Sequence, residues 1–311
     1  MFLGTPAFAV PALDALVALA AAGQLDLTAV VTQPDRPGHR GRVTPSAVAQ
    51  RAAELGLTVL QPLRLRGAEL DPVRSLRPDA LVWAAYGNLI PGALISAAGG
   101  RAVNVHASLL PRWRGAAPIA HAILAGDAET GVTLMEGTAE LDAGPILATR
   151  RTPVLADDDA GALTARLATL GGELLRARLG DYLAGRLSPT PQDASAVTWA
   201  RKLTSADGRL DLSEPAEALA RRVRAMTPDP GAWTPFRGQR LLVLRAAVSG
   251  GRGAAHGTLE APGGQPQVAT GAGWLRLLEV KPAGKRAMAG PEWVRGLGLR
   301  PDDRLGDEPG R

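Results

Sequence analysis

The sequence predicts an α/β protein of two domains, an N-terminal doubly wound, Rossmann-like domain and a C-terminal small, OB-like β-barrel. Short apolar runs alternate with helical patterns through about residue 155. A polar stretch with two prolines, SPTPQDASA, occupies 188–196, and segments separated by glycines follow it. We therefore predict a first domain at 1–187, a linker at 188–204, a barrel at 205–300 and a flexible tail at 301–311.

The first domain is expected to contain five buried parallel strands. The apolar runs that predict them are 2–4, 27–33, 58–62, 80–86 and 102–108. Helical patterns separate the first runs, near 9–22, 47–55 and 67–77. Ser46 is suited to begin the second of these helices, and Gly23 and Gly56 are suited to end the first two.

The remaining elements are predicted in the same way. Two extended runs at 130–137 and 144–154 precede a long helical pattern at about 159–184. Beyond the linker, a helical stretch near 214–226 precedes short alternating segments, which are 240–248, 257–261, 267–271 and 274–280. Short strands separated by glycines are typical of a small antiparallel barrel.

Composition and charge exclude several classes of function. The chain has no cysteine, which excludes disulfides, thiolate nucleophiles and cysteine-based zinc sites. No lysine or arginine precedes Arg36, and the early apolar stretches are too short to span a membrane. We expect a soluble, cytoplasmic protein with no membrane partner.

The net charge of +5 is unevenly distributed. Residues 1–187 carry 17 basic and 17 acidic side chains, whereas residues 188–311 carry 18 basic and 13 acidic ones. A basic C-terminal part is expected if it binds a polyanion such as nucleic acid. Compositional drift in a proteome rich in arginine, alanine and glycine is the alternative interpretation.

Two loops follow predicted strands. GTPAF (4–8) lacks both the G-x-G-x-x-G pattern and a Walker lysine, so we interpret it as a structural turn and expect no NAD. QPDRPGHRGR (33–42) combines prolines, glycines and arginines and cannot be regular structure. It leaves the carboxyl end of the second strand, where a basic loop could bind a polyanionic substrate; a solvated loop is the alternative.

The candidate chemistry lies in Asn104, His106 and Asp142. In a doubly wound sheet the ligand crevice lies at the carboxyl ends of the strands. Asn104, His106 and Ser108 lie at this end of the fifth apolar run, residues 102–108. Strand residues two apart share a face, so an amide and an imidazole are aimed at one point, where they can stabilise an oxyanion and move a proton. A carboxylate at Asp142 could orient that imidazole and stabilise its charged form. An isolated Asn-x-His pair can equally be structural.

The sequence resembles the 10-formyltetrahydrofolate-dependent formyltransferases, and most closely the methionyl-tRNA formyltransferase family. The resemblance extends over nearly the whole chain. The segments that carry it are GTPAFAVPALDAL (4–16), VVTQPDRPGHRGR (30–42), QPLRLR (61–66), AAYGNLIP (84–91), NVHASLLPRWRGAAPI (104–119), TGVTLM (130–135), LDAGPIL (141–147), WARKL (199–203), GTLEA (257–261) and VKPAGKRAM (280–288).

This resemblance implies transfer of a formyl group from 10-formyltetrahydrofolate to the amino group of methionine on initiator tRNA, with no metal and no NAD, by a monomer. It implies that Asn104 and protonated His106 stabilise the oxyanion, and that Asp142 holds His106 and relays protons. The implied folate contacts are Tyr86, Gly87, Leu89, Ile90, Ser108, Leu109, Leu110 and Pro111. The expected tRNA contacts are Arg36, Arg40, Arg42, Lys202, Lys281, Lys285 and Arg286, of which Arg40 matches the arginine of a family loop that enters the acceptor stem.

The chain departs from the family pattern around Asp142. The family usually has GLDTGDM where this chain has ELDAGPI, so Glu140, Ala143 and Pro145 could alter the loop. The short first strand also leaves open whether Met1 is the start of the protein. Two alternatives remain: a formyltransferase acting on another amine such as an amino-sugar nucleotide, and a non-catalytic tRNA-binding homologue.

Overall fold

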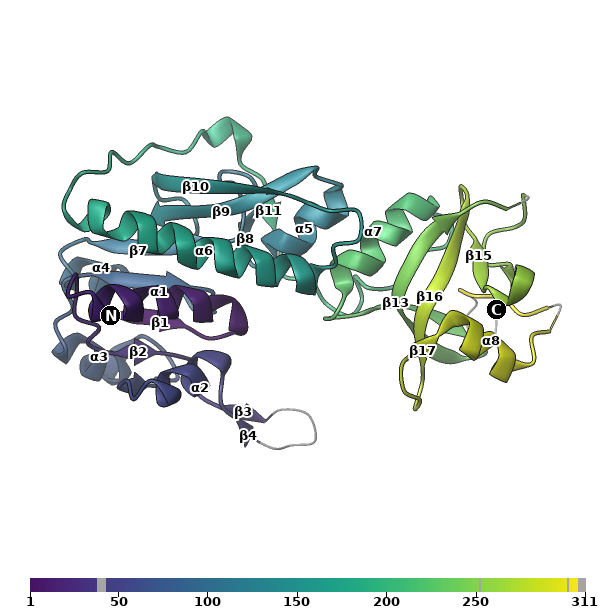
Figure 1. Cartoon of the computed structure of the whole chain (residues 1–311), viewed down its shortest axis with the longest axis horizontal. Helices are drawn as coiled ribbons and strands as arrows, with labels where there is room; N and C mark the ends of the chain where they lie inside the picture. The colour runs from purple at the N-terminus through teal and green to yellow at the C-terminus, as the bar shows by residue number, and fades with distance from the viewer. Residues whose placement is uncertain (38–42, 252, 301, 307–311) are drawn as a thin grey trace. The chain divides into compact units, whose positions relative to one another are not determined.

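The computed structural model describes residues 1–37, 43–251, 253–300 and 302–306 (Figure 1). The chain divides into two compact units. The N-terminal unit comprises Met1–Pro118, Glu129–Pro153 and Thr164–Ala200. The C-terminal unit comprises Ile119–Ala128, Val154–Leu163 and Arg201–Arg311. Within the described residues, no helix is long and apolar enough to cross a lipid bilayer.

The N-terminal unit is built on a seven-stranded sheet in the order β10-β9-β7-β6-β1-β2-β5. The strands are β1 (Phe2–Gly4), β2 (Val30–Val31), β5 (Val59–Leu60), β6 (Leu81–Ala84), β7 (Ala102–His106), β9 (Glu129–Glu136) and β10 (Ile146–Pro153). The first five are parallel to one another, while β9 and β10 are antiparallel to their neighbours. This sheet confirms the predicted doubly wound α/β fold.

Helices cover both faces of this sheet. They are α1 (Val10–Ala21), α2 (Ala47–Glu54), α3 (Asp71–Ser75), α4 (Gly92–Ala97) and α6 (Ala160–Leu183). Helices α1 and α6 lie across one face (Figure 1), and the absence of side chains at Gly171 and Gly172 lets α6 approach Val105 of β7 and Pro11 of α1. Val73 of α3 and Leu94 of α4 join a buried apolar cluster with strand residues. Both faces are therefore buried, as parallel sheets require.

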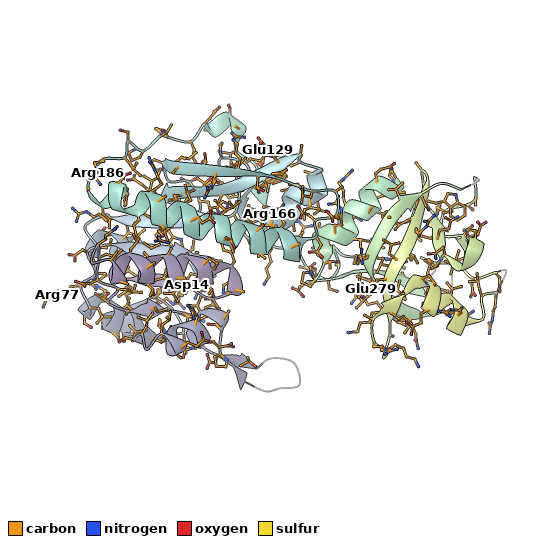
Figure 2. The ribbon with its side chains drawn as sticks, viewed as in Figure 1. Asp14, Arg77, Glu129, Arg166, Arg186 and Glu279 are labelled. Atoms are coloured by element: carbon orange, nitrogen blue, oxygen red, sulfur yellow. The ribbon has the colours of Figure 1, made fainter. Side chains whose placement is uncertain are left out.

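Helix ends follow the expected local chemistry. The Ser46 hydroxyl accepts from the backbone N–H of Ala49 and caps α2. Gly23 and Gly56 follow α1 and α2 with φ of 68° and 66°, a left-handed conformation that glycine adopts at little cost. Charged side chains lie outside: Asp14 of α1, labelled in Figure 2, pairs with Arg51 of α2 at 2.8 Å.

The GTPAF turn joins three strand ends. The Thr5 hydroxyl donates to the backbone oxygen of Tyr86 at 2.9 Å, and the Gln33 side-chain amide donates to the same oxygen at 3.0 Å. Gly87 has φ of 88°, and a Cβ there would lie 2.5 Å from the Gln33 side chain. The turn thus holds the loops after β2 and β6 together, consistent with the structural role predicted for it.

The C-terminal unit contains a six-stranded antiparallel sheet. The path is β12-β13-β16-β15-β14, with β17 paired to β16. The elements are α7 (Ala216–Met226), β12 (Ala232–Phe236), β13 (Gln239–Ser249), β14 (Leu259–Glu260), β15 (Gln267–Ala269), β16 (Trp274–Pro282), β17 (Met288–Ala289) and α8 (Gly290–Leu297). Leu219 and Val223 of α7 and Trp293 of α8 are buried in one cluster with the sheet.

The prediction of a flexible tail is wrong for residues 302–306. Leu305 is 1% exposed and belongs to the core of the C-terminal unit. Arg304 bridges to Thr258, beside β14, and Leu305 bridges to Phe236 of β12. The segment therefore links the two edge strands of the sheet. The charged sequence around it concealed this role, because a single leucine gives no periodic pattern.

Several short elements were not predicted. They are β3 (Arg36–Pro37), β4 (Val43–Thr44), α4, β8 (Arg114–Gly115), α5 (Pro118–Ala125), β11 (Trp199–Ala200), β12, β17 and α8. Two-residue strands such as β8 and β11 exist only because each pairs with the other. Helix α5, PIAHAILA, is apolar on most of its surface and so lacks a clear amphipathic pattern.

Candidate active site

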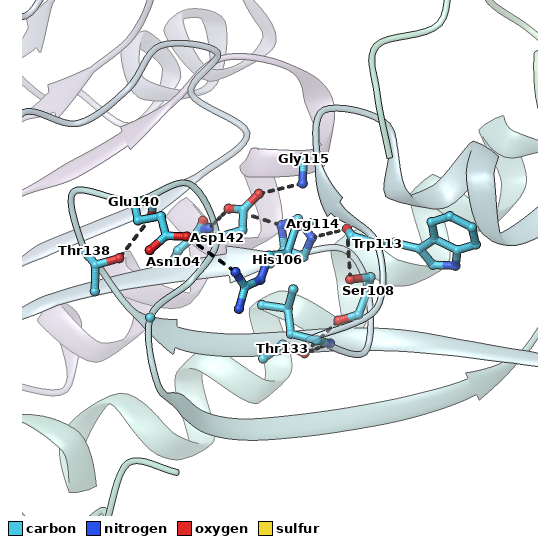
Figure 3. A network of polar contacts seen from close by, with 12 residues as sticks. Asn104, His106, Ser108, Trp113, Arg114, Gly115, Thr133, Thr138, Glu140 and Asp142 are labelled. Atoms are coloured by element: carbon cyan, nitrogen blue, oxygen red, sulfur yellow. Dashed lines mark hydrogen bonds and ion pairs between the residues drawn. The ribbon is translucent and has the colours of Figure 1, made fainter. Parts of the chain in front are cut away.

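Asn104, His106 and Asp142 meet at the carboxyl end of β7 (Figure 3). Asn104 and His106 lie on the same side of β7, and Asp142 comes from the loop between β9 and β10. All three are buried, with 5%, 6% and 8% of their surface exposed. The Asn104 amide donates to Asp142 Oδ1 at 3.2 Å, and His106 Nδ1 lies 3.6 Å from the same oxygen.

The second oxygen of Asp142 is also occupied. Oδ2 accepts from the backbone N–H of Gly115 at 2.9 Å, so each carboxylate oxygen accepts one hydrogen bond. Asp142 has φ of 50°, in the left-handed region that few non-glycine residues adopt. A strained backbone that points a buried carboxylate at two other polar side chains is typical of a functional site.

Each ring nitrogen of His106 faces an oxygen atom. Nε2 lies 2.9 Å from the backbone oxygen of Trp113. Because a carbonyl oxygen can only accept, Nε2 carries a proton. Nδ1 faces the Asp142 carboxylate on the other side of the ring.

The loop after β7 is held by hydroxyl groups. The Ser108 hydroxyl donates to the backbone oxygen of Arg112 at 2.6 Å. The Thr133 hydroxyl of β9 donates to Ser108 O at 2.7 Å and accepts from Leu110 N at 3.1 Å. Ser108 is fully buried, so its side chain shapes the loop. Leu109 and Pro111 in the same loop are half-buried.

The predicted folate segment 86–90 contains both buried and exposed residues. Tyr86 and Ile90 are buried at 2% and 7% exposure and pack in an apolar cluster, and burial raises the pKa of Tyr86 to about 12. Gly87 is exposed, and Leu89 is 67% exposed. Leu89 is therefore the large apolar side chain of this segment that a ligand could cover.

The predicted tRNA contacts lie apart from these residues in the chain. Lys202, Lys281, Lys285 and Arg286 belong to the C-terminal unit and are exposed. Arg286 lies 3.4 Å from Glu292. In the N-terminal unit, the backbone of Arg36 forms part of β3, whereas Arg40 and Arg42 lie outside the described residues.

Sequence reasoning missed residues that support the site. Thr133 holds the loop after β7, and Gly115 donates its N–H to Asp142. Arg114 and Gln192 bond to each other beside the Asp142 loop. Arg114 is 7% exposed although it is charged, yet burial is not visible in a sequence. Among the described residues, no group of three histidine, aspartate or glutamate side chains is arranged to hold a metal ion.

Family models match most of the chain. Residues 1–179 match the model described as formyl transferase, and residues 202–298 match that of the formyl transferase C-terminal domain. Methionyl-tRNA formyltransferase of Halorhodospira halophila is 48% identical, with 97% of each chain covered. The methionyl-tRNA formyltransferase of Thermus thermophilus is 45% identical, with 98% of each chain covered.

Solved structures share the fold at lower identity. An N-formyltransferase from Helicobacter canadensis, in complex with folinic acid and dTDP-3-aminofucose, has a TM-score of 0.67 at 13% identity, over 89% of this chain and 97% of that one. HypX from Aquifex aeolicus, in complex with tetrahydrofolic acid, has a TM-score of 0.59 at 20% identity, over 79% of this chain and 43% of that one. At these identities the likeness concerns the fold alone.

Proposed function

The chain belongs to the formyl transferase family, among the methionyl-tRNA formyltransferases, and we propose that it transfers the formyl group of 10-formyltetrahydrofolate to the α-amino group of methionyl initiator tRNA, for translation initiation. One observation in the structure carries this proposal. Asn104, His106 and the N–H of Gly115 all converge on the carboxylate of Asp142 at the carboxyl end of the parallel strands, where such sheets bind their ligands.

The reaction requires a hydrogen-bond donor that stabilises negative charge and a base that accepts a proton. When the methionine nitrogen attacks the formyl carbon, the formyl oxygen gains negative charge. Asn104 carries two amide N–H groups, and one of them is bound to Asp142. In our proposal the second N–H of Asn104 donates to the formyl oxygen. The Nε2–H of His106 leaves the carbonyl of Trp113 and donates to the same oxygen. Two hydrogen-bond donors that reach the oxyanion in a buried site stabilise it strongly.

Asp142 completes the proposed chemistry. Its carboxylate stabilises positive charge on His106 and, directly or through water, accepts the proton that the attacking amine loses. The carbon–nitrogen bond to the folate then breaks, and the departing nitrogen takes up a proton. Every group involved belongs to a side chain, so we propose that the transfer needs neither a metal nor NAD.

Two surfaces are proposed for the substrates. The folate would lie against Ser108–Pro111 and the 86–90 segment, with backbone polar groups and the exposed Leu89 as contacts. The tRNA would contact Arg36, Arg40 and Arg42 at the crevice and Lys202, Lys281, Lys285 and Arg286 on the C-terminal unit. We further propose that the protein acts as a monomer in the cytoplasm. An amino-sugar acceptor has no support beyond a shared fold.

A single assay separates the candidate acceptors. The purified chain is incubated with 10-formyltetrahydrofolate and, in parallel, with methionyl initiator tRNA, methionyl elongator tRNA and an amino-sugar nucleotide. We expect formyl transfer to the initiator tRNA and far slower transfer to the others. Transfer to the sugar alone would identify a different acceptor, and no transfer to any of them would indicate a non-catalytic homologue.

A further inference from the structure

The loop that carries Asp142 is held by a side chain from the segment that follows α6, residues 184–200, which we call the connecting segment. This side chain is Gln192. Its amide nitrogen donates to the backbone oxygen of Asp142 at 2.9 Å and to that of Gly144 at 2.7 Å. The two N–H groups of the Gln192 amide are thus both bonded to the loop. Gln192 itself follows α6 and lies in the stretch that the sequence identifies only as a linker.

Arg114 fixes the other end of this amide. Its Nε and Nη2 donate to Gln192 Oε1 at 3.0 and 2.8 Å, and its Nη1 lies 3.8 Å from Glu140 in the same loop. Arg114 is followed by Gly115, whose N–H donates to Asp142 Oδ2. Gln192 therefore contacts the backbone oxygen of Asp142. Arg114 supports the same loop and precedes Gly115, the residue that donates to the Asp142 carboxylate.

The connecting segment pairs with the site on both sides of Gln192. Thr190 forms a bridge with Ile146, immediately after the Asp142 loop. Trp199 and Ala200 form β11 and pair with Arg114 and Gly115 of β8. Gly115 must lack a side chain here, because a Cβ would lie 2.8 Å from the backbone oxygen of Ala200.

From this geometry we infer that Gln192 is a positioning residue of the formyl transfer site, which sets the Asp142 carboxylate against His106 and Asn104. The inference rests on the proposed function. Asp142 has a left-handed backbone, a conformation that persists only where its surroundings hold it. Bonds to the oxygens of Asp142 and Gly144 supply that restraint. The segment that follows α6, which belongs to the N-terminal unit, is then part of the active site.

Kinetics of Gln192→Ala and Gln192→Glu test this role. The glutamate keeps the size of the side chain and an acceptor for Arg114, but it replaces both N–H donors with an oxygen that faces two carbonyl oxygens. We expect both variants to lower kcat by about 10-fold to 100-fold, with KM for folate and tRNA nearly unchanged, because misplacement by about 1 Å costs about that much. Asp193→Ala is the matched control, since the Asp193 carboxylate is exposed and bonds to its near neighbour Ser195.

A double substitution separates positioning from general damage. If Gln192 acts through Asp142, adding Gln192→Ala to Asp142→Ala should change kcat by less than about twofold. If the loss of kcat in the double variant equals the product of the losses in the two single variants, Gln192 acts independently of Asp142, and the inference is overturned. Wild-type kcat in Gln192→Glu would overturn it as well.

Amide hydrogen exchange tests the positioning without any activity. The N–H of Gly115 donates to Asp142 Oδ2, so its exchange rate reports where the carboxylate lies. We expect faster exchange at Gly115 in Gln192→Glu and in Asp142→Ala, and an unchanged rate in Asp193→Ala. An unchanged rate in Gln192→Glu would overturn the inference. If the wild-type chain transfers no formyl group, the proposed function fails, while this measurement still decides whether Gln192 positions Asp142.

Discussion

At the scale of single residues, one carboxylate organises the site. Asp142 Oδ1 accepts from the Asn104 amide and faces His106, while Oδ2 accepts from Gly115 N–H. Asp142→Asn therefore places an NH₂ group opposite one of these donors and removes the negative charge that stabilises a charged imidazole. We expect kcat to fall by about 100-fold or more, which steady-state kinetics would measure. A kcat equal to that of the wild type would contradict this role.

His106 is expected to contribute proton transfer and charge stabilisation. His106→Ala should lower kcat by about 100-fold to 10,000-fold, the range typical of general acid–base groups. The side chain lies at the carboxyl end of β7, so the fold should persist, which circular dichroism and urea unfolding would verify. A variant that keeps more than half of the wild-type kcat would remove His106 from the mechanism.

The sequence identified part of this site and could not identify the rest. The two-residue spacing of Asn104 and His106 placed them on one face of a predicted strand, and the structure places them there. Asp142 is a candidate as a carboxylate that could orient the imidazole, and resemblance to a family supplies its role, because it lies 38 positions after Asn104 in the chain. Gln192 and Thr133 are ordinary polar residues in sequence. Their partners lie 48 to 50 and 25 positions away, and only the folded chain brings them together.

At the scale of elements, residues 302–306 close the C-terminal sheet. Leu305 is buried and bridges to β12, while Arg304 bridges to Thr258 beside β14. Leu305→Ala should lower the free energy of unfolding by about 2–5 kcal/mol, the usual loss for a buried leucine. Urea unfolding measures this change. A loss below about 0.5 kcal/mol, typical of a surface position, would show that the segment does not contribute to the core.

Asp303 makes the stability of this unit depend on pH. Arg237 donates to both of its oxygens, at 2.7 and 2.6 Å, and this pairing lowers the pKa of Asp303 below its ordinary value. The stabilisation is therefore complete above the ordinary pKa of about 3.9 and is lost as the pH falls through the lower pKa of the folded state. Asp303→Asn should weaken the dependence of unfolding on pH in that acid range. An unchanged dependence would exclude this ion pair as its source.

The predictability of an element follows from its length and pattern. The long helical pattern near 159–184 matches α6, Ala160–Leu183, because many turns repeat the same signal. Strands β8 and β11, of two residues each, have no pattern of their own and depend on one another. Strand β12, AWTPF, was missed because proline is rare within strands.

At the scale of the whole molecule, the excess positive charge is expected to bind the tRNA backbone. Lys281 and Lys285 are exposed on the C-terminal unit. Replacing both by glutamine should weaken tRNA binding and reduce the slope of log K against log salt by about two units if each contacts a duplex phosphate. Replacing the exposed Arg66 and Arg74 of the N-terminal unit changes the net charge equally and should leave the slope unchanged. Equal effects of the two pairs would mean that net charge, and not a binding surface, sets the affinity.

The most direct test of formyl transfer at this site is a single-turnover measurement with methionyl initiator tRNA and 10-formyltetrahydrofolate. Wild-type protein and Asn104→Ala are compared at saturating substrates, with tRNA binding measured separately for both. We predict transfer to the methionine nitrogen by the wild type and a rate lower by about 100-fold to 1,000-fold in Asn104→Ala, because one oxyanion donor is lost. Binding of the tRNA should be unchanged. Equal rates for the two proteins, or no transfer by the wild type, would contradict the assignment.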